Sequence, residues 1–171
     1  MKKTLIIVLS CLVVLFAACK KPVEPTPEPV DYSASYVGNY LGQFTLSITS
    51  MNNNAVSNMS FPIDSIRIDI TKGTQANAIT ATVTVDNEAY QTSGTATADK
   101  ADFETVQLVI DKPDQNYLFN LDLKLEAMKA LSDTLNIVGT FSGNGNFTMP
   151  TGDVMLLNEV SGSVDGKLRK Q

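Results

Sequence analysis

Histidine and tryptophan are absent from this chain of 171 residues, and its only two cysteines, Cys11 and Cys19, lie near the N-terminus. Without histidine the chain has no Ser-His-Asp relay and no histidine-ligated zinc. No cysteine follows residue 19, so the remainder has neither a disulfide nor a thiol nucleophile. Stability must therefore come from apolar packing and strand pairing. The sequence predicts a non-enzymatic protein with no cofactor and no metal.

The first 21 residues have the order of a secretory signal: Lys2 and Lys3, an apolar run from Leu5 to Phe16, and then small residues. This run is too short for a membrane span, which needs about 20 residues. Phe16-Ala17-Ala18-Cys19 resembles the lipobox of bacterial lipoproteins, although Leu is usual where Phe16 stands. The resemblance implies removal of residues 1–18, acylation of Cys19 and attachment of the chain to a membrane by that anchor. An ordinary signal peptide with an incidental cysteine is the alternative.

The segment after the anchor is a linker. Residues 19–35 hold the lipidated cysteine and a run rich in proline, which favours an extended, polyproline-like chain. Loss of Lys2 and Lys3 reduces the basic residues from 13 to 11, against 18 acidic ones. An acidic chain of this kind argues against nucleic acid as a partner. The predicted location is the cell envelope, most simply the outer membrane, with its periplasmic or outward face left open.

Residues 36–171 form the predicted domain, in which apolar and polar residues alternate with a period of two. Ile66, Ile68 and Ile70 alternate with Ser65, Arg67 and Asp69, and comparable runs recur along the chain. This pattern indicates antiparallel strands with one buried face. Turn residues separate the runs, and the only competitor for a helix, residues 125–131, is short. We therefore predict an all-β fold, an antiparallel up-and-down barrel of about eight strands, with a β-sandwich as the alternative.

The start of the domain, Tyr36-Val37-Gly38-Asn39-Tyr40-Leu41-Gly42, resembles the opening strand of calycin-like (lipocalin-like) β-barrel lipoproteins of Gram-negative gut anaerobes. In that group a Gly-x-Trp opens the first strand, and a basic residue of the last strand packs across the ring. The resemblance implies that Gly38 and Tyr40, with Lys167 or Arg169, close one barrel end. Tyr in place of Trp is a departure from the group pattern.

A barrel of this kind suggests binding of a small apolar or amphipathic ligand in its interior. Aromatic residues that are candidates to line such a cavity are Tyr90, Tyr117, Phe119, Phe141 and Phe147. A packed core is the competing interpretation of the same residues. In that case the domain would be a structural or interaction module that contacts an envelope protein or a glycan.

Other motifs are weaker indications of a specific chemical function. The carboxylates Asp99, Asp102 and Glu104, like Asp111 and Asp114, are spaced as solvated turn residues rather than as a glycosidase pair. Asp64-Ser65-Ile66 and Asp133-Thr134-Leu135 resemble the O-glycosylation signature of Gram-negative gut anaerobes, which makes Ser65 and Thr134 candidate modification sites. The alternation predicts that both hydroxyls face outward.

Overall fold

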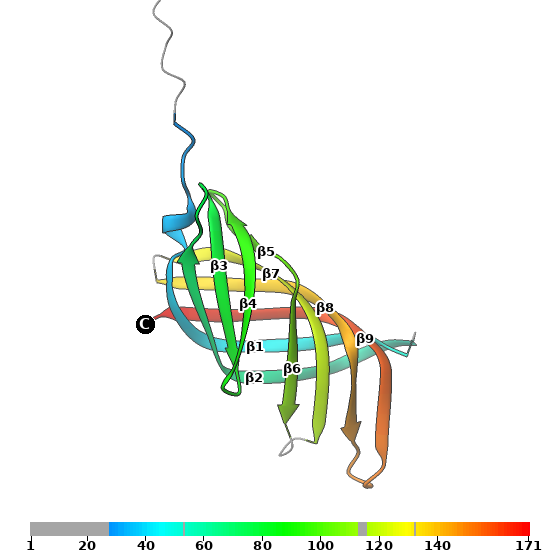
Figure 1. Ribbon diagram of the computed structural model, residues 1–171. Helices are drawn as coiled ribbons and strands as arrows, with labels where there is room; N and C mark the ends of the chain where they lie inside the picture. Colours follow the sequence, from blue (N-terminus) through cyan, green and yellow to red (C-terminus); the bar gives the residue numbers. More distant parts are fainter. Residues whose placement is uncertain (1–27, 53, 113–115, 132) are drawn as a thin grey trace, which may run out of the picture.

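The computed structural model describes residues 28–52, 54–112, 116–131 and 133–171 (Figure 1). Within these residues the chain forms one short 3-10 helix and nine strands: η1 (Ser33–Ser35), β1 (Gly38–Met51), β2 (Asn54–Lys72), β3 (Ala78–Val85), β4 (Glu88–Ala96), β5 (Lys100–Phe103), β6 (Val106–Lys112), β7 (Tyr117–Leu131), β8 (Thr134–Thr148) and β9 (Val154–Lys170). Every strand pair is antiparallel. The all-β class is confirmed.

The strands follow one another around a ring. Their order is β5-β4-β3-β2-β1-β9-β8-β7-β6, and an additional pairing of β5 with β7 closes the sheet. β5 and β6 both pair with β7, on its later and earlier parts respectively, so together they act as one interrupted strand. The nine strands thus occupy eight positions in the ring, and an even number lets all neighbours be antiparallel. A single closed sheet confirms the up-and-down barrel over the β-sandwich.

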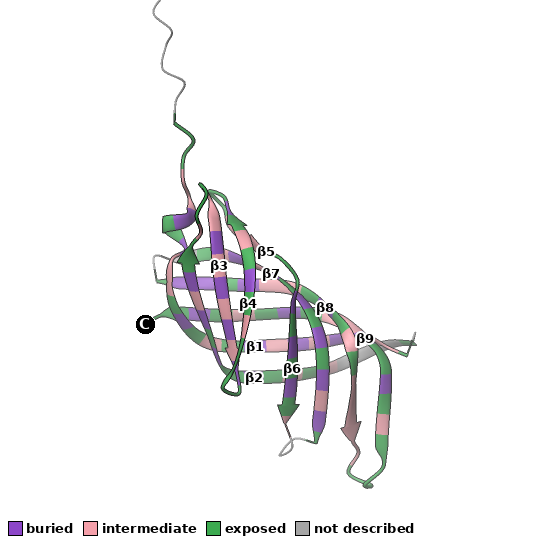
Figure 2. Cartoon of the chain, viewed as in Figure 1, coloured by how far each residue is buried: buried purple, intermediate pink, exposed green. Residues whose placement is uncertain are grey.

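Period-two patterning places the core inside the ring. Buried and exposed residues alternate along the strands, as the banding in Figure 2 shows. Ile66, Ile68 and Ile70 are buried, whereas Arg67 between them is exposed. Residues 125–131 belong to strand β7 and not to a helix. A strand fits because Leu125 and Ala127 are both buried, two residues apart on one face.

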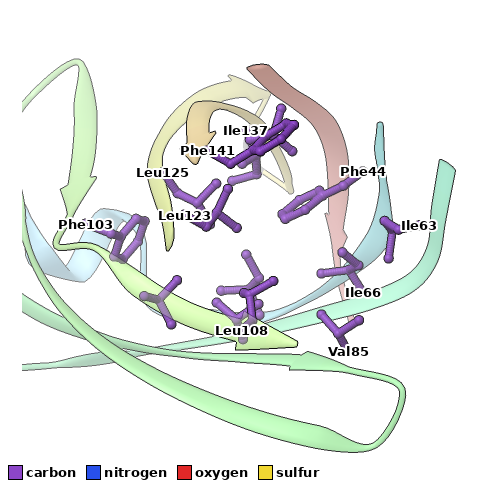
Figure 3. Close-up of a cluster of buried hydrophobic side chains, with 14 of the residues drawn as sticks. Phe44, Ile63, Ile66, Val85, Phe103, Leu108, Leu123, Leu125, Ile137 and Phe141 are labelled. Atoms are coloured by element: carbon purple, nitrogen blue, oxygen red, sulfur yellow. The ribbon is translucent and has the colours of Figure 1, made fainter. Parts of the chain in front are cut away.

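Four phenylalanines belong to the packed interior, each beside a glycine directly opposite on the neighbouring strand. The pairs are Phe44 with Gly166, Phe141 with Gly162, Phe119 with Gly145 and Phe103 with Gly94. A Cβ on any of these glycines would lie 2.4–2.9 Å from a ring atom of its partner. The absent side chain is what makes room for the ring. Figure 3 shows Phe44, Phe103 and Phe141 within the buried cluster.

The closure between β4 and the interrupted strand is short. β4 pairs with β5 only over Gly94–Ala96, and β5 pairs with β7 only over Lys100–Asp102. Lys100 reinforces the second pairing, because its Nζ lies 2.8 Å from Asp102 and 3.1 Å from Glu126. These two carboxylates also raise the pKa of Lys100, Asp102 contributing most.

Asn52 stabilises an irregularity in β9, the last strand. Asn158 and Glu159 of β9 stand opposite the single residue Asn144 of β8, which makes a β-bulge. The side-chain oxygen of Asn52 accepts hydrogen bonds from the backbone N–H groups of Asn158 and Glu159, at 2.8 and 3.4 Å. The β1–β2 turn thereby satisfies the donors that the bulge leaves out of the ladder.

The glycine–phenylalanine pairs give a testable prediction. In Gly166→Ala the new Cβ would meet the Phe44 ring at 2.4 Å and the backbone oxygen of Gln43 at 2.5 Å. We expect the free energy of unfolding, measured with urea, to fall by about 1–3 kcal/mol, as for other overpacked cores. Ser163→Ala, at an exposed position of the same strand, is the control and should change it by less than about 0.5 kcal/mol. Equal stability of the two variants would contradict the packing described.

Candidate binding surface

The barrel interior is packed. A cavity among the described core residues has a volume of about 10 Å³, and its lining includes Phe44, Ile66, Val83 and Leu123. A drug-sized ligand occupies a pocket of roughly 300 Å³ or more. The interior that the structure describes therefore has no room for the small apolar ligand that the sequence suggested.

The five aromatic residues named for that cavity do not line it. Tyr117, Phe119 and Phe141 are core residues, each at most 4% exposed, and Phe147 packs against the same core from its edge. Phe61 of β2 meets Tyr117 and Phe119 edge-on, with ring centroids 4.8 and 5.2 Å away. The Tyr117 hydroxyl is buried without a hydrogen-bond partner in the described structure, and burial raises the pKa of Tyr117.

Tyr90, the fifth aromatic residue, bridges a seam between β4 and β6. These strands show no backbone pairing with each other within the described residues. The Tyr90 hydroxyl accepts a hydrogen bond from the Val109 N–H and donates one to the Val109 carbonyl, both at 3.2 Å. The Asp86–Lys112 ion pair spans the same seam. Tyr90 thus replaces a missing rung of the ladder.

One barrel end is closed by tyrosines and lysines. The Tyr40 hydroxyl donates to the Tyr36 carbonyl at 3.0 Å, and burial raises the pKa of both phenols. Lys170 lies 6.0 Å from the centroid of the Tyr40 ring and donates to the Val37 carbonyl at 2.8 Å. A Cβ on Gly38, whose φ is +155°, would meet the Lys170 side chain at 2.5 Å.

The basic residue at this end is therefore Lys170, rather than Lys167 or Arg169 as the resemblance implied. The reason is that successive side chains of β9 point to opposite faces of the sheet. Leu168 is buried, so Lys170, two residues later, lies on the inner face at the rim, whereas Lys167 and Arg169 point outward. The sequence holds a signal for Lys170, because the apolar residues Val160, Val164 and Leu168 set the inward parity of β9 and Lys170 continues it.

The segment before β1 is bound to the barrel, although the sequence predicts residues 31–35 to be part of the linker. The Asp31 carboxylate accepts hydrogen bonds from the N–H groups of Ser33 and Asn77, and it forms an ion pair with Lys72. Lys72, followed by Ser33 and Asn77, holds the pKa of Asp31 well below its usual range. The folded domain thus extends from Asp31.

Lys167 and Arg169 instead line a groove of about 750 Å³ on the outer face of the sheet. We call it the β9 groove, and its lining comes from β1, β7, β8 and β9: Leu41, Gly42, Gln43, Thr45, Met128, Asn136, Ile137, Val138, Asp165, Gly166, Lys167 and Arg169. Gln43, Lys167 and Asn136 are direct neighbours across three strands. Further outer hollows of about 520, 390 and 310 Å³ lie over other strands.

The candidate glycosylation sites and the carboxylates named in the sequence analysis differ in their exposure. Ser65 is exposed in a β2 bulge with φ 60°, whereas Thr134 is 4% exposed and its hydroxyl donates to Asp133. Thr134 thus has the outward parity that the alternation predicted, because it stands opposite the outward-pointing Arg169, but its side chain is buried rather than exposed. Asp102 is tied to Lys100, and Asp99, Glu104 and Asp111 are exposed. Asp114 lies outside the described residues.

Cys19, the predicted lipidation site, and residues 1–18, the predicted signal peptide, lie outside the described residues. The described part of the chain contains no helix that is long and apolar enough to span a membrane.

No family model and no curated protein matches the chain. A solved structure with a similar shape is a protein of unknown function from the DUF3598 family of Nostoc punctiforme, with 10% sequence identity and a TM-score of 0.43. The match covers 85% of this chain and 53% of the other, so the chain spans about half the length of that protein.

Tyr90 at the seam and Tyr117 in the core are predicted to differ in how loss of the hydroxyl changes the free energy of unfolding. Tyr90→Phe should lower the free energy of unfolding by about 1 kcal/mol, since it removes both bonds to Val109. Tyr117→Phe should leave it unchanged or raise it, because that hydroxyl is buried without a partner. Urea unfolding of the two variants, with amide hydrogen exchange at Val109, measures both effects. A larger loss in Tyr117→Phe than in Tyr90→Phe would contradict this assignment.

Proposed function

We propose that the chain is a lipid-anchored lipoprotein of the bacterial cell envelope, whose barrel is a non-enzymatic interaction module. In this proposal the outer face of the barrel contacts an envelope protein or a glycan, and the interior holds no ligand. The observation that carries it is the contrast between an interior cavity of about 10 Å³ and an outer groove of about 750 Å³. Binding surface is therefore available on the outside of the sheet.

Features of the sequence support the anchor. The order of a basic segment, an apolar run and Ala17-Ala18-Cys19 is what a lipoprotein signal requires. Glu28 to Val30 precede the barrel-bound Asp31 and are exposed. Residues 20–30, if extended at about 3.1 Å per residue, would let the barrel stand roughly 30–35 Å from the lipid surface. The outer membrane remains our proposed location.

The anchor is tested by labelling. Cells that express the chain are fed an alkyne-tagged fatty acid, and the protein is then purified and probed for the tag. Cys19→Ser should lose the label and leave the membrane fraction. Cys11→Ser should keep it, because Cys11 lies in the segment that is removed. Label retained by Cys19→Ser would refute the proposed anchor.

The interaction surface is tested by photo-crosslinking in intact cells. A photoreactive amino acid is placed at Gln43 of β1 in the β9 groove, or at exposed Gln91 on β4, three strand positions away around the ring. We expect a discrete crosslinked product from Gln43 and none from Gln91. Native mass spectrometry of the protein from the same cells should show no small apolar adduct. Equal crosslinking from both positions, or such an adduct lost on unfolding, would overturn the proposal.

A further inference from the structure

The β9 groove has the chemistry of an anion site, in a chain whose net charge is −5. Lys167 and Arg169 leave the same face of β9 about 7 Å apart, which is the repeat of alternate residues in a strand. Neither forms an ion pair with a described carboxylate, whereas Arg67, Lys72, Lys100 and Lys112 all do. Two adjacent cations without acidic partners attract an external oxyanion, and an arginine holds a carboxylate with two parallel hydrogen bonds.

The groups around the two cations suit a polyhydroxylated ligand. Gln43 and Asn136 stand on either side of Lys167, and each carboxamide can donate to one hydroxyl and accept from another. Asp165 is two residues from Lys167 on the same face, next to Thr45. A carboxylate there accepts hydrogen bonds from neutral hydroxyl groups but repels a second anion. The end of the groove with Lys167 and Arg169 thus suits an acidic group, and the end with Asp165 suits uncharged hydroxyl groups.

Other classes of partner fit the groove less well. Extended peptides commonly bind β-proteins at a free strand edge, through main-chain hydrogen bonds. β1, β8 and β9 are each paired on both sides, and β7 is paired with β8 and with β5 and β6, so this face has no free edge. A nucleic acid needs a more extensive basic surface. A lipid bilayer needs a protruding surface, whereas Lys167 and Arg169 line a hollow.

We propose that the β9 groove binds an oligosaccharide in which an acidic sugar alternates with a neutral one. Arg169 and Lys167 bind the carboxylate of the acidic sugar. Gln43 and Asn136 bind its hydroxyls, and Asp165 with Thr45 binds the neutral neighbour. Leu41, which is 42% exposed at the Arg169 end, packs against the C–H face of the acidic sugar. This inference rests on the proposed function, since it names the class of glycan that the outer face contacts.

The test is calorimetric titration of the full chain in non-ionic detergent with hyaluronan tetrasaccharide, whose glucuronate alternates with N-acetylglucosamine. We expect saturable binding that weakens with salt, and no binding of the neutral N-acetylglucosamine tetramer. Lys167→Gln/Arg169→Gln should weaken binding at least tenfold. The control, Lys112→Gln/Lys124→Gln, removes the same charge from β6 and β7, outside the lining of the groove, and should change it less than twofold. Circular dichroism checks that both variants fold.

Asp165 gives a second, independent readout. Because its carboxylate repels a second anion, a heparin tetrasaccharide, which is charged on every sugar, should bind more weakly than hyaluronan tetrasaccharide. Asp165→Asn should reverse this order. Unchanged order in Asp165→Asn, or equal binding by the two charge variants, would overturn the assignment of the groove.

The failures of the two proposals are distinguishable. If hyaluronan tetrasaccharide does not bind but Gln43 still crosslinks to an envelope component, the glycan inference is wrong and the interaction module stands. If the saccharide does not bind and anionic phosphatidylglycerol vesicles do, with loss in Lys167→Gln/Arg169→Gln, the groove faces lipid. Both results overturn the inference.

Discussion

The packing of phenylalanine rings against glycines on the adjacent strands is the constraint on which the rest of the structure depends. A ring of eight strand positions encloses a space that the side chains of its own strands can fill. Here Phe44, Phe103, Phe119 and Phe141 help to fill it, together with the Leu, Ile and Val residues of the core, because the residue opposite each ring has no Cβ. This packing is the basis of the proposed function, in which a barrel filled from within uses its outer face for recognition.

Few backbone pairs close the ring, and side chains reinforce the closure. Three residue pairs join β5 to β7, and Lys100 adds an ion pair to carboxylates on both strands. Where β4 and β6 separate, the Tyr90 hydroxyl satisfies the donor and the acceptor of Val109. An unpaired strand edge invites aggregation, so a side chain that occupies it protects the barrel at its weakest point.

Much of this fold could be predicted from local pattern. The alternation of Ile66, Ile68 and Ile70 with polar residues is a property of neighbouring positions, and it predicts strands and their buried face directly. Thr134 keeps the outward parity, opposite Arg169, but it is only 4% exposed, and alternation along one strand does not predict what covers an outward side chain. The glycine–phenylalanine pairs could not be predicted, since Phe44 and Gly166 meet only through the register of β1 with β9. The groove depends on the same non-local register, which brings Gln43, Lys167 and Asn136 together.

The alternation of side chains along the last strand explains why the closing residue, Lys170, differs from the basic residues of the groove, Lys167 and Arg169. Successive side chains of a strand point to opposite faces, so β9 cannot use Lys170 and Arg169 on the same side of the sheet. Lys170 reaches the rim beside Tyr40, where it donates to the Val37 carbonyl. Lys167 and Arg169 are thereby left on the outer face without a structural partner among the described carboxylates. A cation that the fold does not use for its own stability is available to a ligand, and in β9 the two such cations stand side by side.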